Sequence, residues 1–232
     1  MKNINMKKTE KIILLGVLMM LVAVGFYIFS AKKTSEKNVI SDSTAVSAPF
    51  ANMVIPADYD EATRAVIQEK IDGIKKEYEE KPDIWEVWIS IGGLKTLLKD
   101  YAGAIAAYRQ SIVLYRENTL GYRGIAEVYN QNLKDYKKAE EYYKLALENN
   151  PGDVEVYITL AVLQYYRLND AKAAETTFIT GLARAQNNEE IIVRLIRFYN
   201  TIGDKAKEKN TAKLLLQLHP DNEAYQKEWG GL

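Results

Sequence analysis

The sequence predicts an all-α protein, in which a solenoid of stacked helical hairpins follows one transmembrane helix and a flexible tether. Three observations indicate this fold class. A long uncharged apolar run lies near the amino end, and a polar stretch without helical or strand periodicity follows it. Beyond that stretch, aromatic and small residues recur in the same order with a period of 34 or 35 residues, which is typical of helical repeat proteins.

The predicted transmembrane helix spans residues 12–31 and follows a short amino-terminal tail, residues 1–11. Residues 12–29 are eighteen consecutive uncharged positions. At about 1.5 Å per residue they cover roughly 27 Å, close to the ~30 Å hydrocarbon core of a bilayer. A cleaved signal peptide is the alternative, with Ala23-Val24-Gly25 as its small-residue site. The apolar run continues beyond that site, which favours an uncleaved signal anchor.

The flanking charges predict the orientation of this helix. Four lysines and the α-amino group precede it, whereas three lysines and Glu36 follow it. The positive-inside rule therefore places the amino end in the cytoplasm and the repeat domain on the extracytoplasmic side of a single-pass membrane protein. Residues 32–56 are rich in Ser, Thr, Ala and charge, and we expect a flexible linker there.

The segment after the linker, residues 57–84, is expected to hold one helix that ends before Pro82. Its apolar residues fall along one side of that helix: Ala62, Val66, Ile71, Ile74 and Tyr78. We interpret it as the second half of a truncated repeat unit, which covers the otherwise exposed face of the first complete unit.

Four repeat units follow, each with two stretches of helical period separated by a short turn. Small residues let the two helices of a unit approach closely: Ala139 and Ala146 share one face of a helix and should oppose Ala126. Pro151 cannot continue the second helix and so ends its unit. The predicted units, with a short carboxy-terminal cap after them, are residues 85–118, 119–153, 154–188, 189–222 and 223–232.

These positions resemble the tetratricopeptide repeat, whose pattern is W-x2-L-G-x2-Y, then A-x3-F, then P. In the second unit the matching residues are Tyr122, Ile125, Ala126, Tyr129, Ala139, Tyr143 and Pro151. The resemblance covers about residues 85–222 and implies a right-handed α-solenoid. Lys95 stands where an aromatic residue is usual, and Glu208 stands where a small residue is usual. We therefore expect the fourth helix pair to be looser or to act as a cap.

The resemblance also implies a partner-binding face, because in this family the first helix of each unit lines the concave side and contacts peptides. The family's contact positions fall here on side chains that can bond a peptide backbone, supply apolar area or pair with a carboxylate. The candidate groove residues are Arg123, Glu127, Asn130, Ile158, Val162, Tyr165, Tyr166, Arg197 and Asn200. For the two tyrosines, a place in the core between repeats is the alternative.

Composition argues against several function classes. The chain has no cysteine, which excludes disulfides, thiolate metal sites and thiol catalysis. The one histidine, His219, has no second histidine to act with, so we predict no enzyme, no cofactor and no metal. Residues 1–56 hold seven lysines against three acidic residues, and since the whole chain is neutral, residues 57–232 sum to −4. An acidic domain is unsuited to nucleic-acid binding.

The sequence therefore predicts a membrane-tethered scaffold or adaptor that binds a protein or peptide segment in its concave groove. Two alternatives stay open. One is a structural subunit of a bacterial envelope complex for protein export, pilus or translocon assembly, which would dock by its convex face. The other is a self-associating scaffold, in which case the protein is a homo-oligomer.

Overall fold

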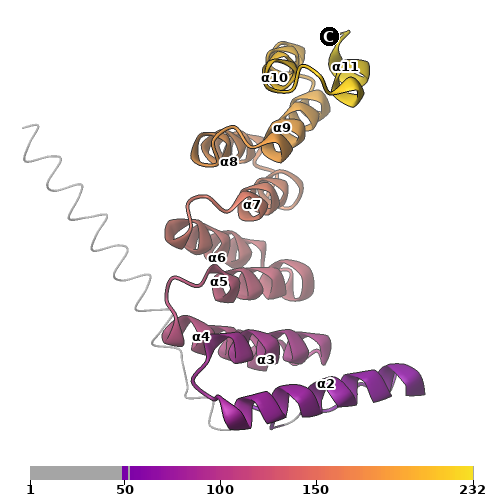
Figure 1. Ribbon diagram of the computed structural model, residues 1–232, viewed down its shortest axis with the longest axis vertical. Coiled ribbons are helices and arrows are strands. Elements are labelled where there is room, and N and C mark those ends of the chain that lie inside the picture. Colours follow the sequence, from indigo (N-terminus) through magenta and orange to yellow (C-terminus); the bar gives the residue numbers. More distant parts are fainter. Residues whose placement is uncertain (1–48, 52, 232) are drawn as a thin grey trace, which may run out of the picture. The chain divides into compact units, whose positions relative to one another are not determined.

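The computed structural model describes residues 49–51 and 53–231 of the chain. These residues belong to the second of the two compact units into which the chain divides, residues 45–232. The described residues form helices and no strand, and the helices stack in chain order (Figure 1). The helices are α2 (Glu61–Glu80), α3 (Trp85–Leu97), α4 (Tyr101–Leu114), α5 (Thr119–Glu127) with its π-helical continuation η1 (Val128–Leu133), α6 (Tyr136–Asn149), α7 (Val154–Tyr166), α8 (Ala171–Arg184), α9 (Glu189–Ile202), α10 (Lys205–Leu218) and α11 (Glu223–Trp229).

The amino-terminal predictions fall on residues outside the described part. These are the tail at 1–11, the transmembrane helix at 12–31 and the linker as far as residue 48. Among the residues that the structure does describe, no helix has both the length and the apolar character needed to cross a bilayer. The transmembrane helix and its orientation therefore stay predictions.

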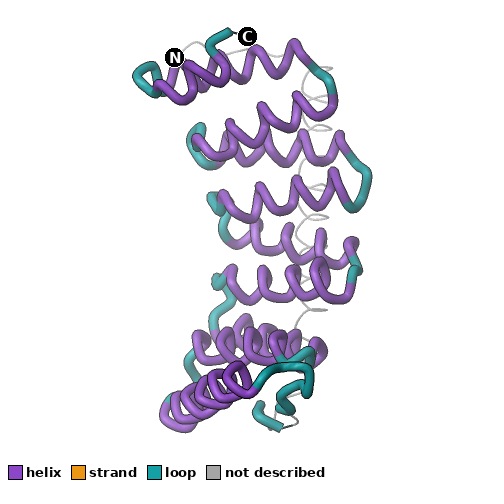
Figure 2. The backbone as a smooth tube through the Cα atoms, turned by 90° about the vertical axis from the view of Figure 1, so that its right-hand side faces the viewer, coloured by secondary structure: helices purple, strands orange, loops and turns teal. Residues whose placement is uncertain are grey.

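The helices pair within each repeat unit: α3 packs on α4, α5 on α6, α7 on α8 and α9 on α10. Alanines at equivalent positions allow this approach, and Ala104, Ala139 and Ala174 of the second helices are fully buried. Each second helix also contacts the first helix of the next unit, so that the hairpins form successive layers joined by short loops (Figure 2). This arrangement confirms the predicted solenoid of helical hairpins.

An aspartate begins the second helix of every unit. Asp100, Asp135, Asp170 and Asp204 each accept a hydrogen bond from the backbone N–H three residues further on, at 2.9, 3.2, 2.8 and 3.0 Å. Such a cap stabilises a helix by about 1 kcal/mol. The residue directly before each aspartate has a positive φ; these residues are Lys99, Lys134, Asn169 and Gly203. A left-handed residue ends the first helix and the aspartate starts the second, which fixes each hairpin turn.

The ring of Tyr108 in α4 joins the first two units. It lies between Gly92 of α3 and Gly124 of α5, and a Cβ atom added at these glycines would lie only 2.6 and 2.5 Å from the ring carbon Cε1. Residues with a side chain would clash there, so the two glycines allow the ring to enter between the helices. The aromatic side chain thereby locks three successive helices together.

The first helices lie on the inner side of the curved stack. α3 contacts α5 directly and α7 contacts α9, whereas no two successive second helices in the described part make an interface of comparable extent. Layers that approach more closely on one side curve toward that side. The concave face is therefore formed by α3, α5, α7 and α9.

The end of the predicted linker is packed against the protein, which corrects the boundary at residue 56. Phe50 lies 5.5 Å from the ring of Tyr78, measured between centroids, and Met53 and Ile55 pack on the core between α2 and α3. The hydroxyl of Tyr59 donates a hydrogen bond to the carbonyl of Leu97 at 3.3 Å. An extended segment can bury alternate apolar side chains without helical periodicity, which is why the sequence pattern did not indicate this contact.

The fourth unit contains Glu208 at the position of a small residue, yet α10 still packs on α9. The Glu208 carboxylate is buried and accepts hydrogen bonds from the Asn200 amide at 2.6 Å and the Lys205 ammonium at 2.8 Å. These bonds satisfy the carboxylate, so its burial does not open the hairpin. Helix α11 then covers the last pair, with Trp229 packed on Ile192, Ile196, Ala212 and Leu215.

Candidate functional site

A cavity opens between α7 and α9 on the concave face, and we name it the α7/α9 cavity. Its volume is about 190 Å³. Four of the predicted groove residues, Val162, Tyr165, Tyr166 and Arg197, come together there. Its lining consists of Ala161, Val162, Tyr165, Tyr166, Phe178, Arg194, Arg197, Phe198 and Thr201.

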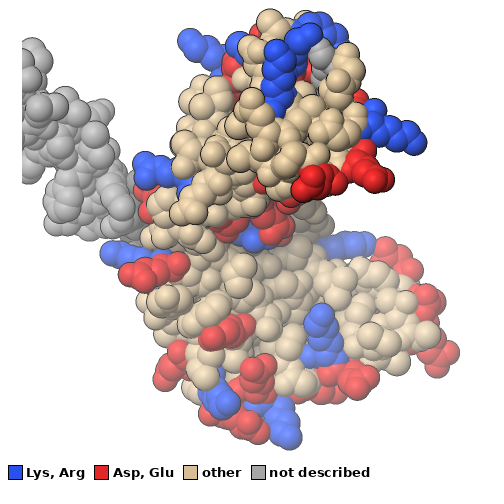
Figure 3. All heavy atoms as spheres, turned by 45° about the horizontal axis from the view of Figure 1, so that its top comes forward, with Lys and Arg blue, Asp and Glu red and all other residues tan. Residues whose placement is uncertain are grey.

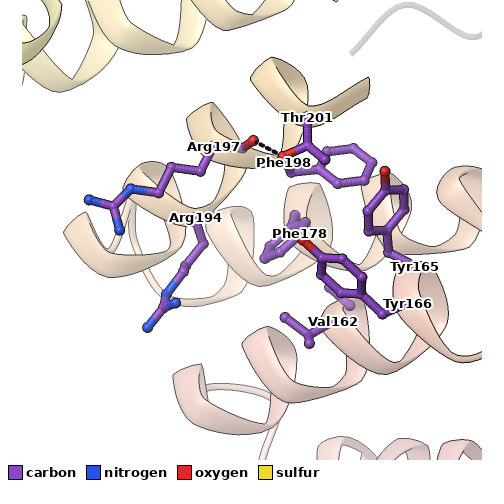
Figure 4. A pocket seen from close by; sticks show the side chains of 9 residues that line it. Val162, Tyr165, Tyr166, Phe178, Arg194, Arg197, Phe198 and Thr201 are labelled. Atoms are coloured by element: carbon purple, nitrogen blue, oxygen red, sulfur yellow. Dashed lines mark hydrogen bonds between the residues drawn. The ribbon is translucent and has the colours of Figure 1, made fainter. Parts of the chain in front are cut away.

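Aromatic rings form the floor and one wall of this cavity. Phe198 meets Tyr165 edge to face, with centroids 5.4 Å apart and planes at 86°, and lies 5.7 Å from Phe178. Tyr165 in turn meets Tyr166 at 4.7 Å. Figure 4 shows Tyr165 and Tyr166 on one side of the cavity, with Arg194 and Arg197 extended on the other. Edge-to-face contacts hold the rings in place and leave an apolar surface.

The two adjacent tyrosines differ in exposure. The sequence left two places open for them, the groove surface or the core between repeats, and each place holds for one tyrosine. Tyr165 is half-buried and packs against the core cluster of the third and fourth units. Tyr166 is 66% exposed. Tyr165 therefore supports the wall of the cavity, and Tyr166 exposes its ring at the surface.

Two further cavities adjoin this one and extend it along the concave face. The α5/α7 cavity, of about 280 Å³, shares Val162 and Tyr166 with it, and the α9/α11 cavity, of about 370 Å³, shares Arg197 and Thr201. We name the three adjoining cavities together the groove. The other residues of the α5/α7 cavity are Asn130, Gln131, Lys134, Thr159, Leu163 and Arg167, and those of the α9/α11 cavity are Ile196, Asn200, Glu208, Glu228 and Trp229.

The π-helical segment η1 positions one end of the groove. The sequence places an extra residue of the second unit in the turn between helices, but the structure absorbs it within the helix as a π turn. This wider turn brings Asn130, Gln131 and Lys134 to the edge of the α5/α7 cavity. Single π turns are frequent at functional sites because they redirect side chains at a helix end.

Charge is distributed unevenly along the groove. Lys134, Arg167, Arg194 and Arg197 line the α5/α7 and α7/α9 cavities, and no carboxylate does so. Elsewhere on the described domain, acidic and basic side chains are interspersed, as the face in Figure 3 shows. Arg194 and Arg197 each have one exposed acidic neighbour: Glu190 lies 3.4 Å from Arg194, and Glu228 lies 3.7 Å from Arg197.

Three predicted groove residues, Ile158, Arg123 and Glu127, line none of the three cavities. Ile158 is buried in the core cluster of the third and fourth units, because its side chain points between helices rather than to the concave surface. Arg123 lies 2.9 Å from Glu155 and 3.8 Å from Glu127, outside the three cavities. Burial raises the pKa of Glu127, with Arg123 opposing and Glu155 reinforcing the shift. Arg123 and Glu127 therefore belong to an ion-pair cluster with Glu155, whose carboxylates are partly exposed.

The remaining two predicted residues line the outer cavities of the groove. Asn130 borders the α5/α7 cavity, close to Tyr143, whose pKa burial raises to about 12. Asn200 borders the α9/α11 cavity, where its amide is engaged by Glu208.

Sequence reasoning missed four groove residues, Lys134, Arg167, Arg194 and Phe198. Arg194 precedes Arg197 by three positions, and this spacing on one helix face was an available signal. Lys134 and Arg167 follow the ends of first helices, where the family's contact positions do not reach.

The described residues were predicted to hold neither a metal site nor a catalytic histidine. Among them, no group of three or more acidic, His or Cys side chains could hold a metal. His219 lies 3.4 Å from Glu189, which also accepts a hydrogen bond from the Tyr225 hydroxyl. These contacts join α11 to the start of α9 at the end of the stack.

Comparison with known proteins agrees with this geometry. Residues 133–192 match the tetratricopeptide repeat family. The match supports the tetratricopeptide repeat assignment. Proteins built from these repeats generally act as protein-interaction scaffolds.

Solved structures and one curated protein are similar to this chain. The crystal structure of MamA is 13% identical, with a TM-score of 0.53 over 74% of this chain and 95% of that chain, which shows a shared fold. The pilF structure from Pseudomonas aeruginosa is 19% identical, with a TM-score of 0.49 over 73% of this chain and 77% of that chain. The transcription factor tau 131 kDa subunit of Saccharomyces cerevisiae is 28% identical over 89 residues, which are 38% of this chain and 8% of that protein. This chain thus matches only a small part of the curated relative's length.

Proposed function

We propose that this protein is a non-catalytic scaffold that holds a segment of a partner protein in the groove, close to a membrane to which residues 12–31 tether it. The observation that carries this proposal is the row of three adjoining cavities, which share lining residues, across α5, α7, α9 and α11. Such a row of cavities suits a peptide segment in an extended form, because it offers apolar anchoring sites with polar groups beside them. Tethering near a membrane would raise the local concentration of the partner there.

Site-specific photo-crosslinking in cells tests the groove. A photoreactive residue at Tyr166 should capture a partner protein, whereas the same residue at Lys137, which is highly exposed on α6, should capture none. Capture that also occurs with Lys137, or that persists when Arg194 and Arg197 are both replaced by Glu, would contradict binding in the groove.

The membrane tether needs a separate experiment. Because the chain has no cysteine, a single engineered cysteine in place of Ser41 can be labelled with a membrane-impermeant maleimide in intact cells. We expect labelling from the extracytoplasmic side and recovery of the protein in the membrane fraction. Recovery as a fully soluble protein would contradict the tether, and labelling only after cell lysis would contradict the orientation.

A second candidate function is docking through the outer face as a structural subunit of an envelope complex. A hollow of about 460 Å³ between α6, α7 and α8 favours it. Its lining includes Leu147, Pro151 and Leu160 beside the threonines of α8. A photoreactive residue at the exposed Thr180 would capture the neighbouring subunit in that case, while Tyr166 would capture nothing.

A further inference from the structure

We infer that the partner segment is acidic and carries one large apolar side chain, which enters the α7/α9 cavity, and that Glu228 of α11 competes with its carboxylates for Arg197. This inference rests on the proposed function and specifies the chemistry of its ligand. Three features of the site support the inference: the volume of the α7/α9 cavity, its aromatic walls and the positive charges beside it.

The cavity accommodates a single side chain. Its volume of about 190 Å³ lies below the roughly 300–1,000 Å³ of sites that take drug-sized molecules. Its deepest residues, Phe178 and Phe198, are buried and apolar. An aliphatic or aromatic side chain would lose its contact with water there and meet ring faces and edges on several sides.

Aromatic walls also suit a cation, such as a methylated lysine. The charges of Arg194 and Arg197 decide between a cationic and an uncharged apolar side chain. The Arg194 and Arg197 side chains lie on the side of the cavity opposite the tyrosines, with their guanidiniums directed outward (Figure 4). A ligand ammonium would be repelled by both charges, which offsets its attraction to the rings. An uncharged apolar side chain is not repelled.

Charge complementarity then selects acidic neighbours for that side chain. Lys134 and Arg167 line the adjoining α5/α7 cavity, so four cations border the two cavities and no carboxylate does. Residues 57–232 as a whole sum to −4, which makes this concentration of positive charge a local reversal. Aspartate or glutamate side chains on both sides of the apolar anchor would meet guanidiniums that can form charge-assisted hydrogen bonds.

Glu228 occupies the place of one such carboxylate. It lies 3.7 Å from Arg197, in a pair whose side chains are 60% and 50% exposed. The next residue, Trp229, is buried against α9 and α10, and this packing fixes the end of α11 that carries Glu228. A weak, exposed pair is readily exchanged for a bidentate one with a ligand. Helix α11 therefore lowers the affinity of the groove for acidic segments.

Fluorescence polarisation with the full-length protein in phosphatidylcholine nanodiscs tests the inference. The probe is a short synthetic peptide of Asp and Glu with one central Phe, compared with an Ala counterpart at the Phe position and a Lys counterpart at the acidic positions. We expect the acidic Phe peptide to bind at least about tenfold more tightly than either counterpart. Glu228→Gln should tighten its binding, up to about fivefold.

Matched charge reversals locate the effect. R194E/R197E should reduce binding of the acidic Phe peptide by at least about tenfold, whereas K209E/K213E, on the exposed side of α10 in the same unit, should leave it unchanged. Equal binding of the Ala or Lys peptide, tighter binding of a single-stranded oligonucleotide, or an unchanged affinity in Glu228→Gln would overturn the inference. If Tyr166 still captures a partner protein in cells, only the ligand chemistry is wrong; if Tyr166 captures none, the proposed function itself is wrong.

Discussion

Replacing Gly124 by Ala should destabilise the protein, whereas the same replacement of Gly73 should stabilise it. Both glycines lie within helices, Gly124 in α5 and Gly73 in α2. A Cβ atom at Gly73 would meet nothing within 4 Å, but at Gly124 it would lie 2.5 Å from Cε1 of Tyr108. The same chemical change therefore adds a methyl group to solvent in one helix and to a filled interface in the other.

The magnitudes follow from two opposing effects. Alanine favours a helix over glycine by about 0.5–1 kcal/mol, which is the full expected gain at Gly73. Carbon atoms in contact are about 3.5–4.0 Å apart, so the Tyr108 ring would have to move by about 1 Å. Gly92 lies against the other side of that ring and leaves no space for the movement. Overpacking of this kind costs about 1–3 kcal/mol, and the net loss at Gly124 should be about 1–2 kcal/mol.

Urea unfolding of the full-length protein, followed by far-ultraviolet circular dichroism, measures both changes. Because Tyr108 causes the clash, Gly124→Ala should lose most of its cost when Tyr108→Ala is also present, and a double-mutant cycle shows this coupling. The reasoning is refuted if Gly124→Ala is as stable as the wild type, or if its cost is unchanged in the Tyr108→Ala background.

Three further predictions concern the ends of the stack. Asp100→Ala leaves the buried Lys95 ammonium without its partner at 2.8 Å and removes a helix cap. Because Asp100 is one-third exposed, we expect a loss of about 2–3 kcal/mol in urea unfolding, rather than the ~3–5 kcal/mol of a fully buried pair; a loss near zero would contradict the pairing. Burial raises the pKa of Asp100, but hydrogen bonds from Lys95 and the Gly103 N–H outweigh it and hold the pKa below its ordinary value. This stabilisation is present at neutral pH and should be lost in acid unfolding as the pH falls below about 4, a loss absent from Asp100→Ala. Trp229→Ala should accelerate amide hydrogen exchange in α9 and α10 and leave α3 and α4 unchanged, since repeats depend on their neighbours; acceleration throughout the stack would argue against a local cap.

The helical hairpins could be predicted because each depends on residues close in sequence. The buried Ala104, Ala139 and Ala174 occur at the same place in successive units and identify the contact line without any knowledge of the fold. Glu208 departs from that pattern, and the sequence indicated a looser pair. The hydrogen bond by which Asn200 satisfies the buried Glu208 carboxylate depends on side-chain geometry, which residue spacing alone does not reveal.

The candidate groove was predicted only in part, because it depends on how the units stack. Val162, Tyr166 and Arg197 were identified, and they lie together. Ile158 was misplaced, since a small rotation of α7 decides whether a side chain points to the concave surface or between helices. Arg194 was missed although it belongs to the same cavity.

By itself the sequence determined the repeat, its helix pairs and the absence of cysteine chemistry, since these follow from residue types and from spacings shorter than one unit. Only the tertiary structure decided that three cavities adjoin on one face, that four cations line two of them and that Glu228 reaches Arg197. The same holds for Phe50, which packs on α2 from a segment with no periodic pattern. The physical reason is that these contacts join different units, and their positions depend on the curvature that accumulates from one packed hairpin to the next.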